Sequence, residues 1–118
     1  MMNSKRIASY NHSGRIGVMV EFACESFMPF DDAEFSTFIH DVAMHIAAED
    51  PSDINELLIQ LFIKNPEVTI RQSIDEAILK HEENIKVCRF IRWDTEKLTS
   101  PPEDLPPKSP AAAMKVVK

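Results

Sequence analysis

The sequence predicts a single domain of the α+β class, in which a three-stranded antiparallel sheet is covered by helices in the order ββααβ, as a two-layer sandwich. Three observations predict it: two alternating segments around a turn at residues 11–14, amphipathic helical stripes between residues 31 and 81, and a β-rich segment at residues 85–93. The 118 residues leave room for one domain with a modest core.

The first two strands are predicted over residues 5–12 and 15–25, because both segments alternate between apolar and polar side chains. Asn11-His12-Ser13-Gly14 between them has the composition of a hairpin turn. Gly17 lies inside the second strand and predicts a bulge or a close backbone approach there. One face of that strand is apolar and consists of Ile16, Val18, Val20, Phe22 and Cys24.

A helix is predicted to begin near Asp31 or Asp32, since Asp31 and Glu34 have the spacing of a capping box. Met44 lies nearly opposite the apolar stripe of this helix, so it is either a surface methionine or part of a second buried face. Glu49-Asp50-Pro51 ends the helix. The stripe consists of Phe35, Phe38, Ile39, Val42 and Ile46.

Two more helical segments and one strand complete the domain. A shorter helical stripe over residues 54–62 is broken by Asn65-Pro66. Thr69 and Gln72 form a second capping box, which starts a helix that runs to about His81. The segment at 85–93, IKVCRFIRW, is rich in β-formers. Three strands leave two edges and a partly exposed face, so we expect self-association.

Composition limits the partners. Residues 99–118 hold five of the eight prolines and no aromatic residue, which predicts a disordered tail after a core domain at residues 1–98. The net charge of −6 argues against direct binding of nucleic acid. No run of eighteen apolar residues and no signal peptide are present, so we expect a cytosolic protein with reduced cysteines and no membrane partner.

No motif of an enzyme or a cofactor site is present, and we expect no catalytic residues, no cofactor and no metal. His40 and His45 are five residues apart, which places them about 140° apart on a helix rather than on one face. We therefore expect two solvent-exposed helix histidines instead of a metal pair.

The positions of the cysteines and arginines also favour structural roles for these residues. Cys24 and Cys88 fall on two strands, and no positioned base accompanies either thiol. Arg89 and Arg92 occupy odd and even positions of the last strand, so we expect them on opposite faces, solvated at the surface rather than joined in an anion site.

The segment SFMPF at residues 26–30, called the apolar loop below, holds three large apolar side chains between a strand and a helix. Loops normally run over the surface. Two interpretations stay open: the loop caps the core, or Phe27 or Phe30 is exposed and fills a pocket of a partner protein.

Two ordered blocks of the sequence carry a recognisable pattern. The first includes Ser9-Tyr10, His12, residues 14–21 (GRIGVMVE), Cys24-Glu25 and residues 41–48 (DVAMHIAA). The second includes residues 84–87 (NIKV) and 89–92 (RFIR), preceded by Thr69, residues 76–78 and Glu82. Both blocks resemble the core domain of bacterial elongation factor Ts. The resemblance covers about residues 7–94 and implies a shortened, divergent member of that family.

Members of that family bind the GTPase elongation factor Tu and promote release of GDP. Aligned without gaps, the resemblance places the family's wedge, Thr-Asp-Phe, at Ser26-Phe27-Met28, whereas a one-residue slip would keep the phenylalanine of the wedge at Phe27. In both alignments the aspartate is lost and an apolar wedge can survive. The helical segment between the two blocks is shortened to residues 51–60, and the family's N-terminal docking module has no counterpart in this sequence. Loss of the docking module and loss of the aspartate together predict weakened exchange.

The resemblance therefore predicts a protein that binds elongation factor Tu, with weak or residual nucleotide exchange. The predicted contact residues are Cys24, Glu25, Ser26, Phe27, Met28 and Phe30. A secondary interface is predicted at His12, Met44 and His45. The alternative is a structural module that forms a homodimer through its sheet, as the family's core does, and has no exchange activity.

Overall fold

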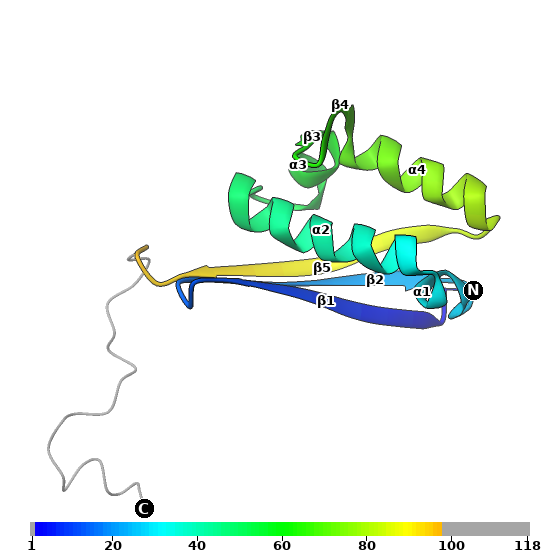
Figure 1. The fold of residues 1–118 in the computed structure, drawn as a ribbon, viewed down its shortest axis with the longest axis horizontal. Helices are drawn as coiled ribbons and strands as arrows, with labels where there is room; N and C mark the ends of the chain where they lie inside the picture. Colours follow the sequence, from blue (N-terminus) through cyan, green and yellow to red (C-terminus); the bar gives the residue numbers. More distant parts are fainter. Residues whose placement is uncertain (1, 98–118) are drawn as a thin grey trace, which may run out of the picture.

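The structure, a computed structural model, describes residues 2–97. Its main sheet is antiparallel with the strand order β1-β2-β5, formed by β1 (Ser4–His12), β2 (Ile16–Cys24) and β5 (Ile85–Asp94). Helices cover one face of the sheet, and no element of the described residues covers the other face (Figure 1). The predicted α+β class with a three-stranded sheet is confirmed. The predicted boundary at residue 98 and the predicted tail at 99–118 lie outside the described residues.

The predicted hairpin is formed by β1 and β2, which pair from Ser4 opposite Cys24 to His12 opposite Ile16. Ser13 and Gly14 both have positive φ, and the backbone N–H of Gly14 donates to Asn11 Oδ1 at 2.8 Å. Asparagine and glycine therefore have the roles that turn chemistry gives them.

The predicted irregularity at Gly17 is wrong. Gly17 pairs regularly with both neighbouring strands, and a Cβ added there would meet nothing within 4 Å. The bulge lies instead on β5, where Arg89 pairs with Glu21 and Val87 with Phe22, which leaves Cys88 as the extra residue. Because of this bulge, the residues of β5 that face the helices change from odd to even numbers. Phe90 therefore packs against the core, as Ile85 and Val87 do before the bulge.

The long helix α2 (Ala33–Glu49) lies along β1 and β2 and buries the predicted stripe, with Phe38 only partly buried. Its N-cap is Asp32, whose carboxylate accepts from the backbone N–H of Phe35 at 3.1 Å. The predicted capping pair of Asp31 and Glu34 is wrong, because Asp31 ends a separate one-turn helix, α1 (Met28–Asp31). Met44 is half-buried, between the two predicted alternatives.

The helix predicted over residues 54–62 is shorter than expected. Helix α3 (Ile54–Ile59) ends at Gln60, whose backbone is extended, and β3 (Leu61–Phe62) then pairs with β4 (Asn65–Thr69). Asn65-Pro66 therefore starts a strand instead of only breaking a helix. The second predicted capping box is confirmed, since Thr69 and Gln72 bond reciprocally at the start of α4 (Ile70–His81).

His45 is fully buried, so its predicted exposure is wrong. The small sheet of β3 and β4 lies over this flank of α2 (Figure 1). The backbone N–H of Ile63 donates to His45 Nδ1 at 3.3 Å, and Nε2 lies 2.8 Å from Gln60 Oε1. Both ring nitrogens are therefore hydrogen-bonded, and His45 joins α2 to the segment that follows α3. His40 is exposed, as predicted.

Arg92 is also not the solvated surface residue that the strand pattern suggested. Its guanidinium donates to the carbonyl oxygen of Ala47 from Nε at 3.2 Å and from Nη2 at 2.9 Å, and Nη1 lies 3.5 Å from Asp50 Oδ1. Arg92 thus satisfies a free carbonyl at the end of α2 and complements the negative end of the helix dipole. Arg89 is a surface residue, as predicted, and pairs with Glu21 at 3.1 Å.

None of the helices within residues 2–97 is long and apolar enough to cross a membrane.

Replacing each of these two arginines by alanine separates the buried contact from the surface contact. The Arg92 side chain is 12% exposed and that of Arg89 is 77% exposed. Arg92→Ala should lower the free energy of unfolding by about 2 kcal/mol, because it removes two charge-assisted hydrogen bonds. Arg89→Ala should cost less than about 1 kcal/mol. Urea denaturation measures both values, and equal losses would contradict the role given to Arg92.

Candidate functional site

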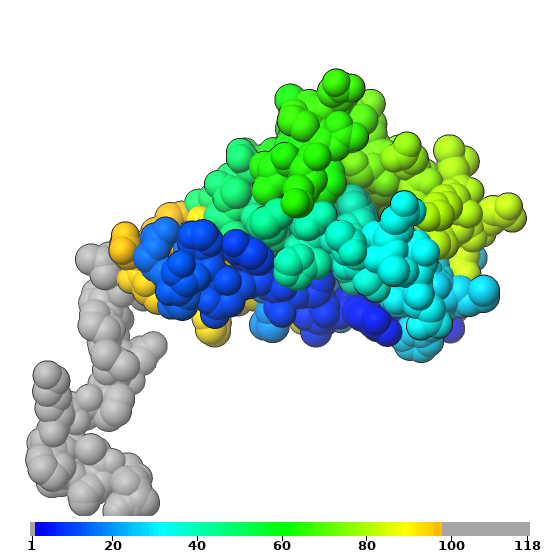
Figure 2. Space-filling model, viewed as in Figure 1, coloured from blue at the N-terminus to red at the C-terminus, as the bar shows by residue number. Residues whose placement is uncertain are grey.

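The apolar loop lies at the end of the molecule where α2 begins and α4 ends (Figure 1). In Figure 2 the cyan surface of this region lies beside the yellow-green surface of the turn between α4 and β5. The second half of the loop is the helical turn α1, with Pro29 in its first turn. Proline is favoured there because its fixed φ suits the start of a helix.

The two open interpretations of the apolar loop each hold for a part of it. Phe30 is only 2% exposed, and its ring centroid lies 5.7 Å from that of Phe35 in α2. Pro29 is buried beside it, and the guanidinium carbon of Arg6 lies 5.1 Å from the Phe30 ring centroid. Phe27 and Met28, by contrast, are 55% and 73% exposed. The loop caps the core with one half and presents two large apolar side chains with the other.

Four hydrogen bonds join the start of the loop to the turn between α4 and β5. The Glu83 carboxylate accepts from the backbone N–H of Ser26 at 3.0 Å and from its hydroxyl at 2.5 Å. Glu25 Oε2 accepts from the backbone N–H of Asn84 at 3.2 Å and from its Nδ2 at 2.8 Å. The predicted contact residues Glu25 and Ser26 are therefore already engaged within the chain.

Cys24 is buried at the end of β2 and presents no surface to a partner, which corrects its place among the predicted contact residues. Burial raises the pKa of its thiol to about 12, and the nearby Glu83 and Cys88 add to the rise. Within residues 2–97, no group of three or more His, Cys, Asp or Glu side chains is arranged to hold a metal ion.

Sequence reasoning placed Asp31 at a helix cap and not beside the exposed pair. Its side chain is exposed at the end of α1, three residues after Met28 and four after Phe27. This spacing places a carboxylate on the same side of the helical turn as the two exposed apolar side chains. The proline at position 29 was the available signal, because a proline in this context favours the first turn of a helix.

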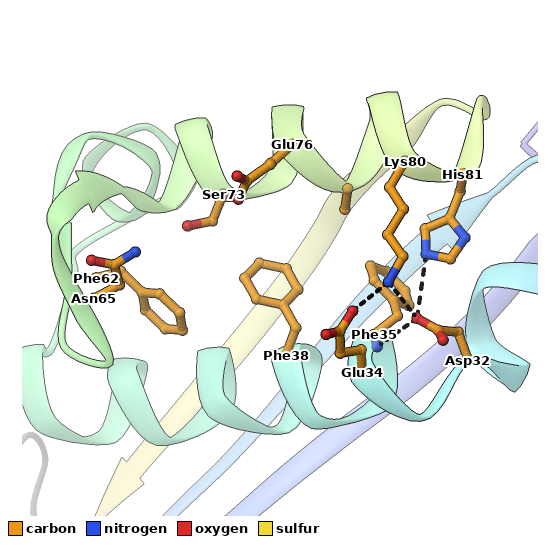
Figure 3. Close-up of a pocket in the computed structure, with 11 residues that line it drawn as sticks. Asp32, Glu34, Phe35, Phe38, Phe62, Asn65, Ser73, Glu76, Lys80 and His81 are labelled. Carbon is orange, nitrogen blue, oxygen red and sulfur yellow. Dashed lines mark hydrogen bonds and ion pairs between the residues drawn. The ribbon is translucent and has the colours of Figure 1, made fainter.

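A groove of about 470 Å³ lies between α2 and α4 (Figure 3). Phe35, Phe38 and Phe62 form its floor. At the end nearest the apolar loop, Lys80 Nζ pairs with Glu34 and lies 3.5 Å from Asp32 Oδ2. The hydrogen bond to Glu34 raises the pKa of Lys80, so the ammonium stays charged at neutral pH. These ion pairs join the positive end of the α2 dipole to the negative end of the α4 dipole, so their role is structural.

The structure places the residues of the predicted secondary interface in different environments. His12 is exposed at the end of β1, where its Nδ1 lies 3.1 Å from the Tyr10 hydroxyl. Met44 is half-buried. His45 is fully buried, so it cannot contribute to a surface.

Comparison with known proteins gives the same family over both blocks. Residues 1–56 match the family model described as Elongation factor TS. Elongation factor Ts of Carboxydothermus hydrogenoformans is 33% identical over 159 aligned positions, which cover 95% of this chain and 73% of that protein.

The chain belongs to the elongation factor Ts family. Elongation factor Ts of Alkaliphilus metalliredigens is 32% identical over 75% of this chain, and that of Solibacter usitatus is 30% identical over 70%. The chain spans 62% and 60% of the length of these two relatives.

The alignment with the Carboxydothermus elongation factor Ts is longer than the 118 residues of this chain. That relative therefore has residues without a counterpart between the aligned parts. The match to the elongation factor Ts model includes β1, β2, the apolar loop and α2. The relative extends the match to the part of the chain that contains β5.

The two thiols should differ in reactivity. With a pKa of about 12, Cys24 has about one thiolate in ten thousand molecules at pH 8, and its sulfur is buried. Iodoacetamide at pH 8 should therefore label Cys88, which is only half-buried, well before Cys24. Peptide mass spectrometry measures both, and labelling in urea provides the control in which both react. Equal labelling of the native protein would place Cys24 outside the core.

Proposed function

We propose that this chain binds the GTPase elongation factor Tu through the apolar loop, with Phe27 and Met28 entering a pocket of the GTPase. Membership of the elongation factor Ts family supports the choice of partner. The observation that carries the proposal is the exposure of these two neighbouring apolar side chains on a segment fixed at both ends.

Physical chemistry supports a contact at this point. A large aromatic or methionine side chain buried in a partner's pocket contributes a large share of the binding energy. Ordering a flexible loop on binding would offset part of that gain. Here Pro29 and Phe30 are buried on one side of the pair and Ser26 is hydrogen-bonded on the other, so little order remains to be imposed.

We further propose that nucleotide exchange is weak in this chain. An exchange factor acts by binding the nucleotide-free GTPase more tightly than the loaded form, and linkage then weakens nucleotide binding by the same factor. Phe27 stands where the family resemblance expects an aspartate. Asp31, at the end of the same helical turn, supplies a carboxylate near that position, and we assign the residual exchange of this proposal to it.

Release of a fluorescent GDP analogue from elongation factor Tu tests this function, together with direct binding. Phe27→Ala and Met28→Ala should each weaken binding at least tenfold, about 1.4 kcal/mol, because each removes a buried apolar contact. Both should change the free energy of unfolding by less than about 0.5 kcal/mol, since the side chains are exposed.

Ile59→Ala is the matched control, because Ile59 is as exposed as Met28 but lies on α3. Absence of binding by the wild-type chain at micromolar concentration would reject the proposed function. A large loss of stability in Phe27→Ala would instead assign that ring to the core.

A second function, self-association through the sheet, is favoured by a separate observation. The uncovered face of the sheet carries four exposed apolar side chains, Ile7, Met19, Ile91 and Trp93. Met19 pairs with Ile91 across β2 and β5, and Gly17 pairs with Trp93. An uncovered apolar sheet face favours association, and a second copy of this chain offers a matching surface.

Light scattering tests the second function. If the face pairs two copies, the wild-type mass should be twice the 13.4 kDa of the chain, and Trp93→Glu should give a monomer because it buries an unpaired charge. Leu79→Glu, at an exposed position of α4, is the control and should leave the mass unchanged. A wild-type monomer across the micromolar range would reject self-association.

A further inference from the structure

We propose that Glu83 and Asn84 are positioning residues that hold the apolar loop ready for its partner. This inference rests on the proposed function, but it concerns residues outside the loop. It follows from the four hydrogen bonds between residues 25–26 and residues 83–84, which are called the clamp below.

The clamp is reciprocal. The Glu83 carboxylate uses both oxygens to accept two bonds from Ser26. The Glu25 carboxylate accepts two bonds from Asn84, in the opposite direction. Each segment therefore supplies one carboxylate and two donors, and rotation of the loop about one bond would break the others. Charge-assisted bonds of this kind are stronger than neutral ones.

The turn that carries Glu83 and Asn84 is itself fixed. It joins α4 to β5 in three residues, and Glu82 at its start has the left-handed conformation, with φ 57°, that ends α4. The backbone N–H of Glu82 donates to the carbonyl oxygen of Ile78 at 2.8 Å. The residue that follows the turn, Ile85, is buried in the core. The clamp therefore ties the loop to rigid elements on both sides of the turn.

The clamp also reaches the exposed pair directly. The Ser26 hydroxyl that donates to Glu83 accepts from the backbone N–H of Met28 at 3.2 Å. That N–H belongs to the first residue of α1 and would otherwise be without an intrahelical partner. Glu83 orients the hydroxyl, and the hydroxyl caps the turn that presents Phe27 and Met28.

The clamp is poorly explained as a contribution to the core alone. Glu25 and Asn84 are exposed, and Ser26 and Glu83 are only half-buried. Removing such bonds changes global stability little, but it lets the loop sample other conformations. Binding must then overcome the entropic cost of ordering the loop, and the affinity for the partner decreases about tenfold.

The test compares Glu83→Ala with Glu82→Gln, a neighbouring glutamate outside the clamp. Hydrogen exchange of the free protein and binding to elongation factor Tu are measured for both. In Glu83→Ala the amides of Ser26 and Met28 should exchange at least tenfold faster and the affinity should decrease about tenfold. Glu82→Gln should change neither.

Two readouts keep the outcomes distinct. If the wild-type chain does not bind the GTPase, the proposed function fails, while faster hydrogen exchange in Glu83→Ala still establishes the clamp. Faster hydrogen exchange with unchanged affinity for the GTPase overturns the positioning role. Unchanged hydrogen exchange overturns the clamp itself. If Glu83→Ala does not fold, Asn84→Ala removes a single side-chain bond and is judged by the same two measurements.

Discussion

The structure depends on a chain of phenylalanine rings that packs the sheet against the helices. Phe22 on β2 contacts Phe35 and Phe38 of α2 with ring centroids 6.3 and 6.4 Å apart. Phe30 extends the chain to α1 at 5.7 Å from Phe35, and Phe62 extends it to β3 at 5.7 Å from Phe38. Most of these contacts are tilted or edge-to-face, the geometry that aromatic rings prefer. In a domain of this size, few other groups bury as much apolar area.

This aromatic chain also determines the shape of the candidate site. Phe30 enters the core, and the half-exposed Phe27 ring lies against it with the two ring centroids 6.1 Å apart, while Met28 is 73% exposed. Burial at Phe30 and hydrogen bonding at Ser26 act on opposite ends of a five-residue segment. The exposed pair is therefore held by interactions that also stabilise the fold, together with the contact between the Phe27 and Phe30 rings.

Sequence periodicity was sufficient for the parts of the fold that local rules determine. The hairpin, the stripe of α2 and the capping box at Thr69 follow from spacing and side-chain chemistry within a few residues. His45 and Arg92 could not be placed in this way. His45 is buried because β3 and β4 cover its flank of α2, and Arg92 reaches a carbonyl 45 residues earlier in the chain. No periodic pattern records such distant contacts.

The candidate site likewise has features that local sequence rules predict and features that depend on distant contacts. The apolar character of residues 26–30 is visible in the sequence, but which ring enters the core depends on Phe35, and the clamp joins residues more than 50 positions apart. The exposed carboxylates nearest to Phe27 are that of Glu25, which the clamp engages, and that of Asp31 at the end of α1.

The position of the Asp31 carboxylate matters for the difference between binding and exchange. An apolar pair that contacts the loaded and the empty GTPase equally well would bind both and accelerate nothing, because linkage requires a difference in affinity. A carboxylate, by contrast, is sensitive to the charge of a bound nucleotide and its metal ion, and so it is a group through which such a difference can arise. Under the proposed function, Phe27 and Met28 therefore supply affinity, and the reach of Asp31 sets how much of that affinity is converted into nucleotide release.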